Sequence, residues 1–182
     1  MFALALAAVG ALRLGEIAVS AARIRRRPDA LIGEPALFPV MALLHVAVVS
    51  LPPAEVVLLD RPFLPALAVA AAAVLAGATA LRIWTLAAIG RAWNVRIVRP
   101  EPGAVATGGP YRFIRHPNYL CVVLELAALP LLHTAWISAL VLSAWNAVVL
   151  SRRIRTEERA LAQIPEWRAA FAGRARLFPG LF

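Results

Sequence analysis

The side chains best suited to chemistry gather in one short stretch, residues 109–119, of sequence GPYRFIRHPNY. Pro117 disfavours helical geometry at His116 and suits the first position of a following helix, so the sequence predicts that a helix begins there. The free backbone N–H groups and the positive dipole end of that helix would face the polar stretch. Such a helix start can hold an anionic group, for example the carboxylate of a ligand.

A second polar cluster begins at Ser151. Arg153 and Glu157 are four residues apart and share a helix face, and Asn146 lies on the same helical stripe. One interpretation is the wall of a pocket. The other is a solvated helix with ordinary ion pairs, each worth only ~0.3–0.5 kcal/mol. The spacing by itself favours the second interpretation.

Glu125 adds a buried acid between the two clusters. It lies on the face of Asn118 and Val122 within an apolar run. A buried carboxylate needs a partner, which Asn146 or an arginine would supply. The sequence leaves open whether Glu125 takes part in catalysis or holds helices together.

Apolar elements must position these clusters, because 62% of the 182 residues are hydrophobic. About 20 apolar residues cross a membrane. Five stretches of this kind are predicted as spans: 1–22, 35–51, 63–81, 117–132 and 135–150. Residues 52–62 and 91–115 are predicted as connections, the third helix as running on towards residue 88, and the polar segment from 151 as helical to about 172.

Charges within these spans carry structural information. Arg13 and Glu16 are three residues apart in the first span and are predicted to pair across one helix face. A structural pair facing the helix bundle is favoured over a functional one. His45, alone on an apolar helix, is given no role.

The basic residues indicate the orientation of the chain. All 19 are arginine, the formal net charge is +9, and the five-span layout places 17 of them on one side. By the positive-inside rule that side, with the C-terminus and both polar clusters, is cytosolic. This distribution fits a membrane protein better than a nucleic-acid binder.

The Ala/Arg/Leu/Val-rich composition points to a bacterial inner or plasma membrane, and the single Cys121 excludes a cysteine metal cluster. No metal site is predicted.

Three motifs resemble one known family. They are Thr107-Gly-Gly-Pro-Tyr111, Arg115-His-Pro-Asn-Tyr119 and Arg153-x-x-x-Glu157-Glu158. Together they resemble the isoprenylcysteine carboxyl methyltransferase family, integral-membrane enzymes that use S-adenosylmethionine, over roughly residues 80–180. Arg-His-Pro-x-Tyr alone is also similar to phospholipid N-methyltransferases and membrane sterol reductases.

The resemblance implies a cofactor site beneath the cytosolic ends of the last two spans. It assigns Arg153 to the substrate and leaves Arg96 as a further cofactor contact. It assigns these positions to the cofactor: Gly103, Ala104, Val105, Ala106, Tyr111, His116, Pro117, Asn118, Tyr119 and Glu157.

Physical chemistry agrees with that assignment. Methyl transfer from a sulfonium is an in-line displacement that mainly needs positioning and exclusion of water, and no metal. Arg115 and His116 at a helix start suit a methionine carboxylate, while Glu157 suits a ribose hydroxyl or an amino group. Tyr111 and Tyr119 would pack on adenine or close the sulfonium pocket.

The acceptor decides which residues are catalytic. Arg153 would orient an acceptor carboxylate, which is already nucleophilic, with Asn146 and Glu125 as further substrate contacts. A phenol or enol would need a base, for which His116 and Glu125 are candidates. Arg153, Glu157 and His116 are therefore the predicted catalytic residues.

We therefore predict an all-α polytopic membrane protein of one domain, residues 1–182, with three N-terminal spans (1–88) and a cofactor-binding part (89–182). The predicted activity is O-methylation of a lipophilic acceptor, either an isoprenoid-type carboxylate or a hydroxyl on an alkylated polyketide ring. Alternatives are a phospholipid N-methyltransferase, a sterol-type reductase that uses NADPH, and a non-catalytic membrane protein. The expected product is S-adenosylhomocysteine, and the expected partners are membrane lipids, with no nucleic acid. The oligomeric state is not predicted.

Overall fold

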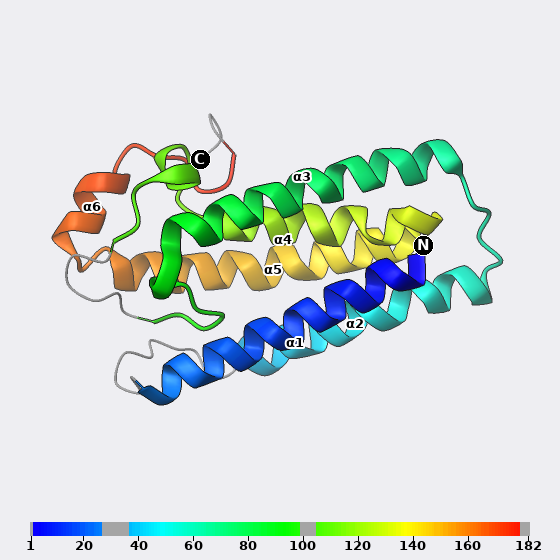
Figure 1. The fold of residues 1–182 in the computed structure, drawn as a ribbon, viewed down its shortest axis with the longest axis horizontal. Coiled ribbons are helices and arrows are strands. Elements are labelled where there is room, and N and C mark those ends of the chain that lie inside the picture. Colours follow the sequence, from blue (N-terminus) through cyan, green and yellow to red (C-terminus); the bar gives the residue numbers. More distant parts are fainter. Residues whose placement is uncertain (1, 27–36, 99–104, 179–182) are drawn as a thin grey trace.

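A computed structural model describes residues 2–26, 37–98 and 105–178, and six α-helices account for most of them (Figure 1). Helices α1 to α5 lie lengthwise beside one another, and the short α6 lies at one end (Figure 1). That end, where α3 and α5 finish and α4 begins, is called the polar end below. The α-helices are α1 (Phe2–Arg26), α2 (Leu37–Leu58), α3 (Pro65–Ile89), α4 (Pro117–Ala128), α5 (Trp136–Leu161) and α6 (Pro165–Phe171).

The fold is that of an all-α membrane protein, as predicted. Within the described residues, three helical segments are long and apolar enough to cross a membrane, namely Pro39–Leu58, Pro65–Ile89 and Trp136–Leu161. Large apolar side chains such as Val46, Val69 and Leu140 are more than 60% exposed on their outer faces, as expected of surfaces that contact lipid. Helix α1 is also 25 residues long, and α4 with the following 3₁₀ turn forms a shorter apolar segment. Five crossings therefore stay a prediction.

The predicted connection at residues 52–62 is partly wrong. Helix α2 continues through Pro52 and Pro53 to Leu58, so the connection to α3 is short. Proline removes backbone hydrogen bonds inside a helix, and packing against neighbouring helices makes that loss tolerable in membrane helices. The extension also brings Glu55 to the start of α5.

Glu55 caps α5. Its carboxylate accepts hydrogen bonds from the backbone N–H groups of Ile137 (3.2 Å) and Ser138 (2.6 Å) and from the Ser138 hydroxyl (2.7 Å). Arg61 neutralises the same carboxylate at 2.9 Å. A carboxylate suits the free N–H groups and positive dipole end of a helix, so this contact sets the depth of α5 against α2.

The C-terminal helix is interrupted, contrary to the prediction of one helix to about residue 172. Helix α5 ends at Leu161, and α6 starts at Pro165. Ile164, the residue before the proline, has extended geometry (φ −95°, ψ 113°), as the steric clash with a proline ring requires. The break turns the chain so that residues 172–178 return across the polar end (Figure 1).

Four charged side chains, two of them buried and two partly buried, join α1, α3 and α4. Arg82 pairs with Glu16 (2.9 Å) and Glu125 (2.9 Å), while Arg13 pairs with Glu16 (2.5 Å) and with Glu125. The predicted pairing of Arg13 with Glu16 is confirmed, and the partners of Glu125 are arginines, not Asn146. The five-span layout counted Arg82 among the 17 arginines of the cytosolic side, but Arg82 is only 3% exposed and lies inside α3. We call Arg13, Glu16, Arg82 and Glu125 the four-charge cluster.

Candidate functional site

Tyr111 is positioned by a 3₁₀ turn (Gly109–Arg112) that lies against the end of α3. Gly109 has φ +57°, and a Cβ there would lie 2.8 Å from the Cβ of Ala88, so only glycine fits this close approach. Tyr111 is buried and meets Phe171 of α6 edge-on, with ring centroids 6.5 Å apart. Burial, with a smaller contribution from the charge of Glu157, raises the pKa of Tyr111, so its hydroxyl stays neutral.

The start of α4 at Pro117 is confirmed. The C-terminal segment lies along the chain just before it: the N–H of Arg115 donates to the Ala175 carbonyl (2.9 Å), and the N–H of His116 donates to the Arg176 carbonyl (3.0 Å). Ile114 and Ala175 form an isolated parallel bridge. The free backbone donors that the sequence places at this helix start are therefore partly used by the protein itself.

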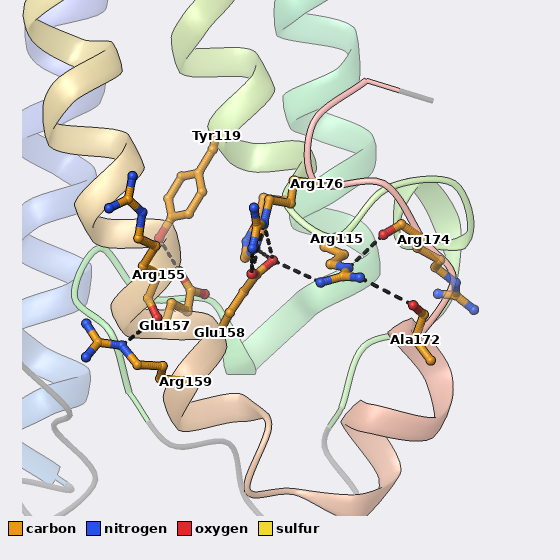
Figure 2. A network of polar contacts seen from close by, with 10 residues as sticks. Arg115, Tyr119, Arg155, Glu157, Glu158, Arg159, Ala172, Arg174 and Arg176 are labelled. Carbon is orange, nitrogen blue, oxygen red and sulfur yellow. Dashed lines mark hydrogen bonds and ion pairs between the residues drawn. The ribbon is translucent and has the colours of Figure 1, made fainter. Parts of the chain in front are cut away.

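Glu158 is the hub of a polar network at this point (Figure 2). It accepts hydrogen bonds from Arg176 (2.8 and 3.0 Å) and Arg115 (3.3 Å) and contacts Nε2 of His116 (3.2 Å). The hydrogen bonds and charge of Glu158 raise the pKa of Arg176, which stays protonated. The network ties α4, α5 and the C-terminal segment together, so Arg115 and His116 have structural partners.

Glu157, the neighbouring acid, takes part in a different set of contacts. The hydroxyl of Tyr119 donates a hydrogen bond to the carboxylate of Glu157 and accepts one from Nε of Arg153 (2.6 Å). The other guanidinium nitrogens of Arg153 contact Met41 of α2 and the carbonyl of Val95. The phenol of Tyr119 thus links the predicted acid to the predicted substrate arginine.

A small cavity of about 120 Å³ lies at the polar end, and we call it the polar cavity because several charged and amide side chains line it beside apolar ones. Its wall contains most of the predicted cofactor positions, together with aromatic side chains from α6. Lining it are Val105, Ala106, Tyr111, Arg115, His116, Asn118, Tyr119, Arg153, Glu157, Trp167 and Phe171, with Trp93, Asn94, Arg96 and further apolar residues.

A larger, mainly apolar cavity of about 610 Å³ lies deeper between α1, α2, α4 and α5. The predicted substrate residues Arg153, Asn146 and Glu125 all line it. Five residues line both cavities, so the two spaces share one wall: Trp93, Asn94, Asn118, Tyr119 and Arg153. We call this set the shared wall.

Two polar atoms in the shared wall are buried and have no hydrogen-bond partner among the residues that the structure describes. They are Nε1 of Trp93, a donor, and Oδ1 of Asn118, an acceptor. Buried polar groups of this kind are rare in folded proteins, and a bound ligand is a common reason for them. Both atoms are therefore available to a ligand that reaches the shared wall.

The structure brings the predicted site residues together with few exceptions. Gly103 and Ala104 lie outside the described residues, and Pro117 is buried in α4 without lining either cavity. Sequence reasoning missed Trp93, Asn94 and the α6 aromatics. The only sequence signal for Trp93 was an aromatic residue inside the polar segment 91–115.

Comparison with known proteins agrees with this geometry. The profile of the isoprenylcysteine carboxyl methyltransferase (ICMT) family matches residues 69–163, slightly more than half of the chain. The chain belongs to the ICMT family. The match runs from α3 through α5 and so includes the shared wall and both acids of α5, whereas α6 and the C-terminal segment lie beyond it.

Two curated relatives resemble the same half. The uncharacterized protein YpbQ of Bacillus subtilis is 39% identical over 92 residues, which are 50% of this chain and 55% of YpbQ. The cobalt-zinc-cadmium resistance protein CzcN of Cupriavidus metallidurans is 35% identical over 100 residues, 54% of this chain and 44% of CzcN. The chain thus spans about half the length of the curated relatives it matches.

Proposed function

We propose that this protein is an S-adenosylmethionine-dependent methyltransferase of a bacterial membrane, with its cofactor cavity facing the cytosol, and that it methylates an oxygen of a lipophilic acceptor. The observation that carries the proposal is the shared wall. A polar cavity and an apolar cavity meet at Trp93, Asn118, Tyr119 and Arg153. An enzyme that transfers a methyl group from a polar cofactor to a lipophilic acceptor must bind the two molecules next to each other.

The residues of the polar cavity suit S-adenosylmethionine chemically. Glu157 accepts hydrogen bonds, Trp93 has an unused donor, and Asn118 has an unused acceptor, while Tyr111, Trp167 and Phe171 offer an aromatic surface. When bound, this cofactor supplies a methyl group already activated on a sulfonium. The cavity volume of about 120 Å³ is below the ~300–1,000 Å³ of common ligand sites, so we expect side chains around it to move when the whole cofactor binds.

The acceptor cavity favours an oxygen that arrives already ionised. His116 lines the smaller cavity and not the acceptor cavity, and Glu125 is held by two arginines, so neither candidate base is placed in the acceptor cavity as a free base. The guanidinium of Arg153 in the shared wall stabilises an anionic oxygen nearby. These contacts support an isoprenoid-type carboxylate or an acidic ring hydroxyl as the group to be methylated.

The alternatives differ in what must bind at the shared wall. An N-methyltransferase needs a neutral amine there, and Arg153 disfavours its cationic precursor. A sterol-type reductase would bind a nicotinamide phosphate, and a non-catalytic protein would bind neither cofactor. The proposal therefore predicts a specific pattern of cofactor binding.

Calorimetric titration of the detergent-purified protein with S-adenosylhomocysteine tests it, beside an NADPH control. We expect micromolar binding of S-adenosylhomocysteine and at least tenfold weaker binding by Glu157→Gln, because the variant exchanges a charged acceptor for a neutral amide. The matched control is Glu166→Gln, an exposed acid of α6 outside both cavities. It should bind like the wild type.

Product analysis then separates the acceptors. The protein is incubated with the labelled methyl donor and long-chain carboxylic acids, phenols and amines. Labelled esters or ethers support O-methylation, whereas labelled amines alone would move the activity to the N-methyltransferase class. Binding of NADPH without S-adenosylhomocysteine would overturn the methyltransferase proposal.

A further inference from the structure

Asn146 is a buried polar residue. It projects from the middle of α5, is 5% exposed and lines the larger cavity, and its amide makes no hydrogen bond to any residue that the structure describes. A buried amide offers two donors and an acceptor, and leaving them unused disfavours the folded state. An unused amide in a mainly apolar wall indicates a ligand group at that depth.

His45 of α2 lines the same cavity, and one of its two ring nitrogens is already hydrogen-bonded. Its Nδ1 lies 2.6 Å from the carbonyl of Met41. A carbonyl only accepts, so in the neutral ring Nδ1 carries the proton and Nε2 is an acceptor. Within the described part of the chain, Nε2 has no hydrogen-bond partner. Asn146 and His45 thus offer donors and an acceptor from two helices.

Away from the shared wall, which holds the unpaired atoms of Trp93 and Asn118, the other charged groups of this cavity are already paired. Arg13, Glu16 and Glu125 line it too, but they belong to the four-charge cluster and bond to one another and to Arg82. Most of the remaining wall is aliphatic, including Val9, Leu44, Val48, Val122, Leu126 and Leu129. Among the described residues beyond the shared wall, Asn146 and His45 are therefore the groups that can recognise a polar atom inside an apolar ligand.

Helix geometry sets the depth of this contact. Asn146 precedes Arg153 by seven residues, which is ~10 Å along the helix axis. His45 follows Met41 by four residues, ~6 Å, and Met41 contacts Arg153. The pair therefore lies roughly 6–10 Å from the shared wall.

We propose that the larger cavity binds an acceptor with a second hydrogen-bonding oxygen, a hydroxyl or a carbonyl, which Asn146 and His45 recognise roughly 6–10 Å from the oxygen that is methylated. The inference rests on the proposed function for the meaning of the shared wall. It narrows the acceptor to an amphiphile with two polar points and apolar surface between and beyond them.

Matched ligand pairs test it by direct binding to the wild-type protein in detergent. One pair is hexadecanoic acid with and without a hydroxyl on the eighth carbon; the other is a long-chain alkylphenol with and without a hydroxyl on the third carbon of the chain. In at least one pair we expect the hydroxylated member to bind about tenfold more tightly. Asn146→Leu should abolish this preference and leave affinity for the plain member within about twofold.

Stability supplies the second readout. Without ligand, Asn146→Leu should have a higher Tm than the wild type, because an unbonded amide is replaced by an apolar side chain of similar size. Ser143→Ala, on the same helix but outside the cavity, is the control and should keep the ligand preference. A raised Tm with a lost preference distinguishes ligand recognition from a structural role.

Three results would overturn the inference. They are equal affinity for both members of each pair, an equal loss for both members in Asn146→Leu, and no binding of any of the four compounds. Titration of the same samples with S-adenosylhomocysteine tests the methyltransferase proposal separately from the proposal for Asn146 and His45. If S-adenosylhomocysteine does not bind but the hydroxylated ligand is still preferred, the methyltransferase proposal is wrong and the proposal for this second site is unaffected.

Discussion

Two neighbouring acids of α5 take on different tasks. Glu157 lines the polar cavity and bonds to Tyr119, whereas Glu158 points into the network that holds the C-terminal segment (Figure 2). Consecutive helix residues are about 100° apart around the axis, so they face different neighbours. The motif's two acids thus separate: Glu158 holds the fold, and Glu157 faces the cavity that we propose for the cofactor.

Exchanging each acid for its amide should show this division. Glu158→Gln removes a charge shared by Arg176, Arg115 and His116, so we expect a loss of about 2 kcal/mol and a Tm lower by about 4–8 °C. Glu157→Gln should keep the Tm within about 2 °C and lose cofactor affinity. Thermal unfolding monitored in detergent provides the comparison.

A reversed outcome would contradict the assignment. If Glu158→Gln kept the wild-type Tm while losing affinity for S-adenosylhomocysteine, Glu158 would be the ligand-facing acid. Arg176→Gln serves as the companion variant and should give a smaller loss of stability, because the Arg176 side chain is 48% exposed and Glu158 keeps its contacts with Arg115 and His116.

At the scale of the helices, the four-charge cluster holds α1, α3 and α4 together. Its two arginines and two glutamates balance in charge, and the side chains of Arg82 and Glu125 are 4% and 12% exposed. Charges within apolar helix bundles are commonly paired in this way. The cluster explains why Glu125 lies in the cavity wall without being free to act as a base.

Removing one member of the four-charge cluster should destabilise the protein far more than removing one arginine and one glutamate together. Glu125→Leu leaves two arginines with a single acid, so we expect a loss of about 3–5 kcal/mol, or a Tm lower by roughly 10 °C. The double variant Arg82→Met with Glu125→Leu keeps the Arg13–Glu16 pair and should recover most of that loss. Unfolding of the single and double variants measures the coupling.

Methyl transfer by the double variant decides the role of Glu125. If the acid only joins helices, the folded double variant should methylate a carboxylic-acid acceptor within about threefold of the wild type. If the double variant is folded but its methyl-transfer activity is more than a hundredfold lower than that of the wild type, Glu125 is a catalytic group instead.

At the scale of the whole molecule, arginines gather at one end of an apolar bundle. Arg112, Arg115, Arg153, Arg159 and Arg176 all belong to segments at the polar end (Figure 1), whereas Arg61 follows α2 at the other end. The positive-inside rule assigns the arginine-rich end to the cytosol. The cofactor, which is made in the cytosol, would then have direct access to its cavity.

Cysteine labelling tests this orientation. Starting from Cys121→Ser, which replaces a buried thiol by a hydroxyl, single cysteines are placed at the exposed positions Pro62 and Arg168. In intact cells a membrane-impermeant maleimide should label Pro62→Cys and not Arg168→Cys. Permeabilised cells should label both. Labelling of Arg168→Cys alone in intact cells would invert the assigned topology.

The sequence by itself determined the local features of this protein. Apolar length predicted the helices, Pro117 predicted the start of α4, and the Arg153–Glu157 spacing predicted a shared helix face. The motifs pointed to the ICMT family that the comparisons confirm. These inferences hold because each depends on residues within a few turns of one helix.

Only the tertiary structure decided which side chains meet across helices. Glu125 binds Arg82 and Arg13, Glu158 binds the C-terminal segment, and Asn146 is left without a partner among the described residues. Such contacts depend on the rotation and depth of each helix in the bundle. Packing between distant segments sets both, as when Glu55 caps α5, and no spacing within a single helix encodes them.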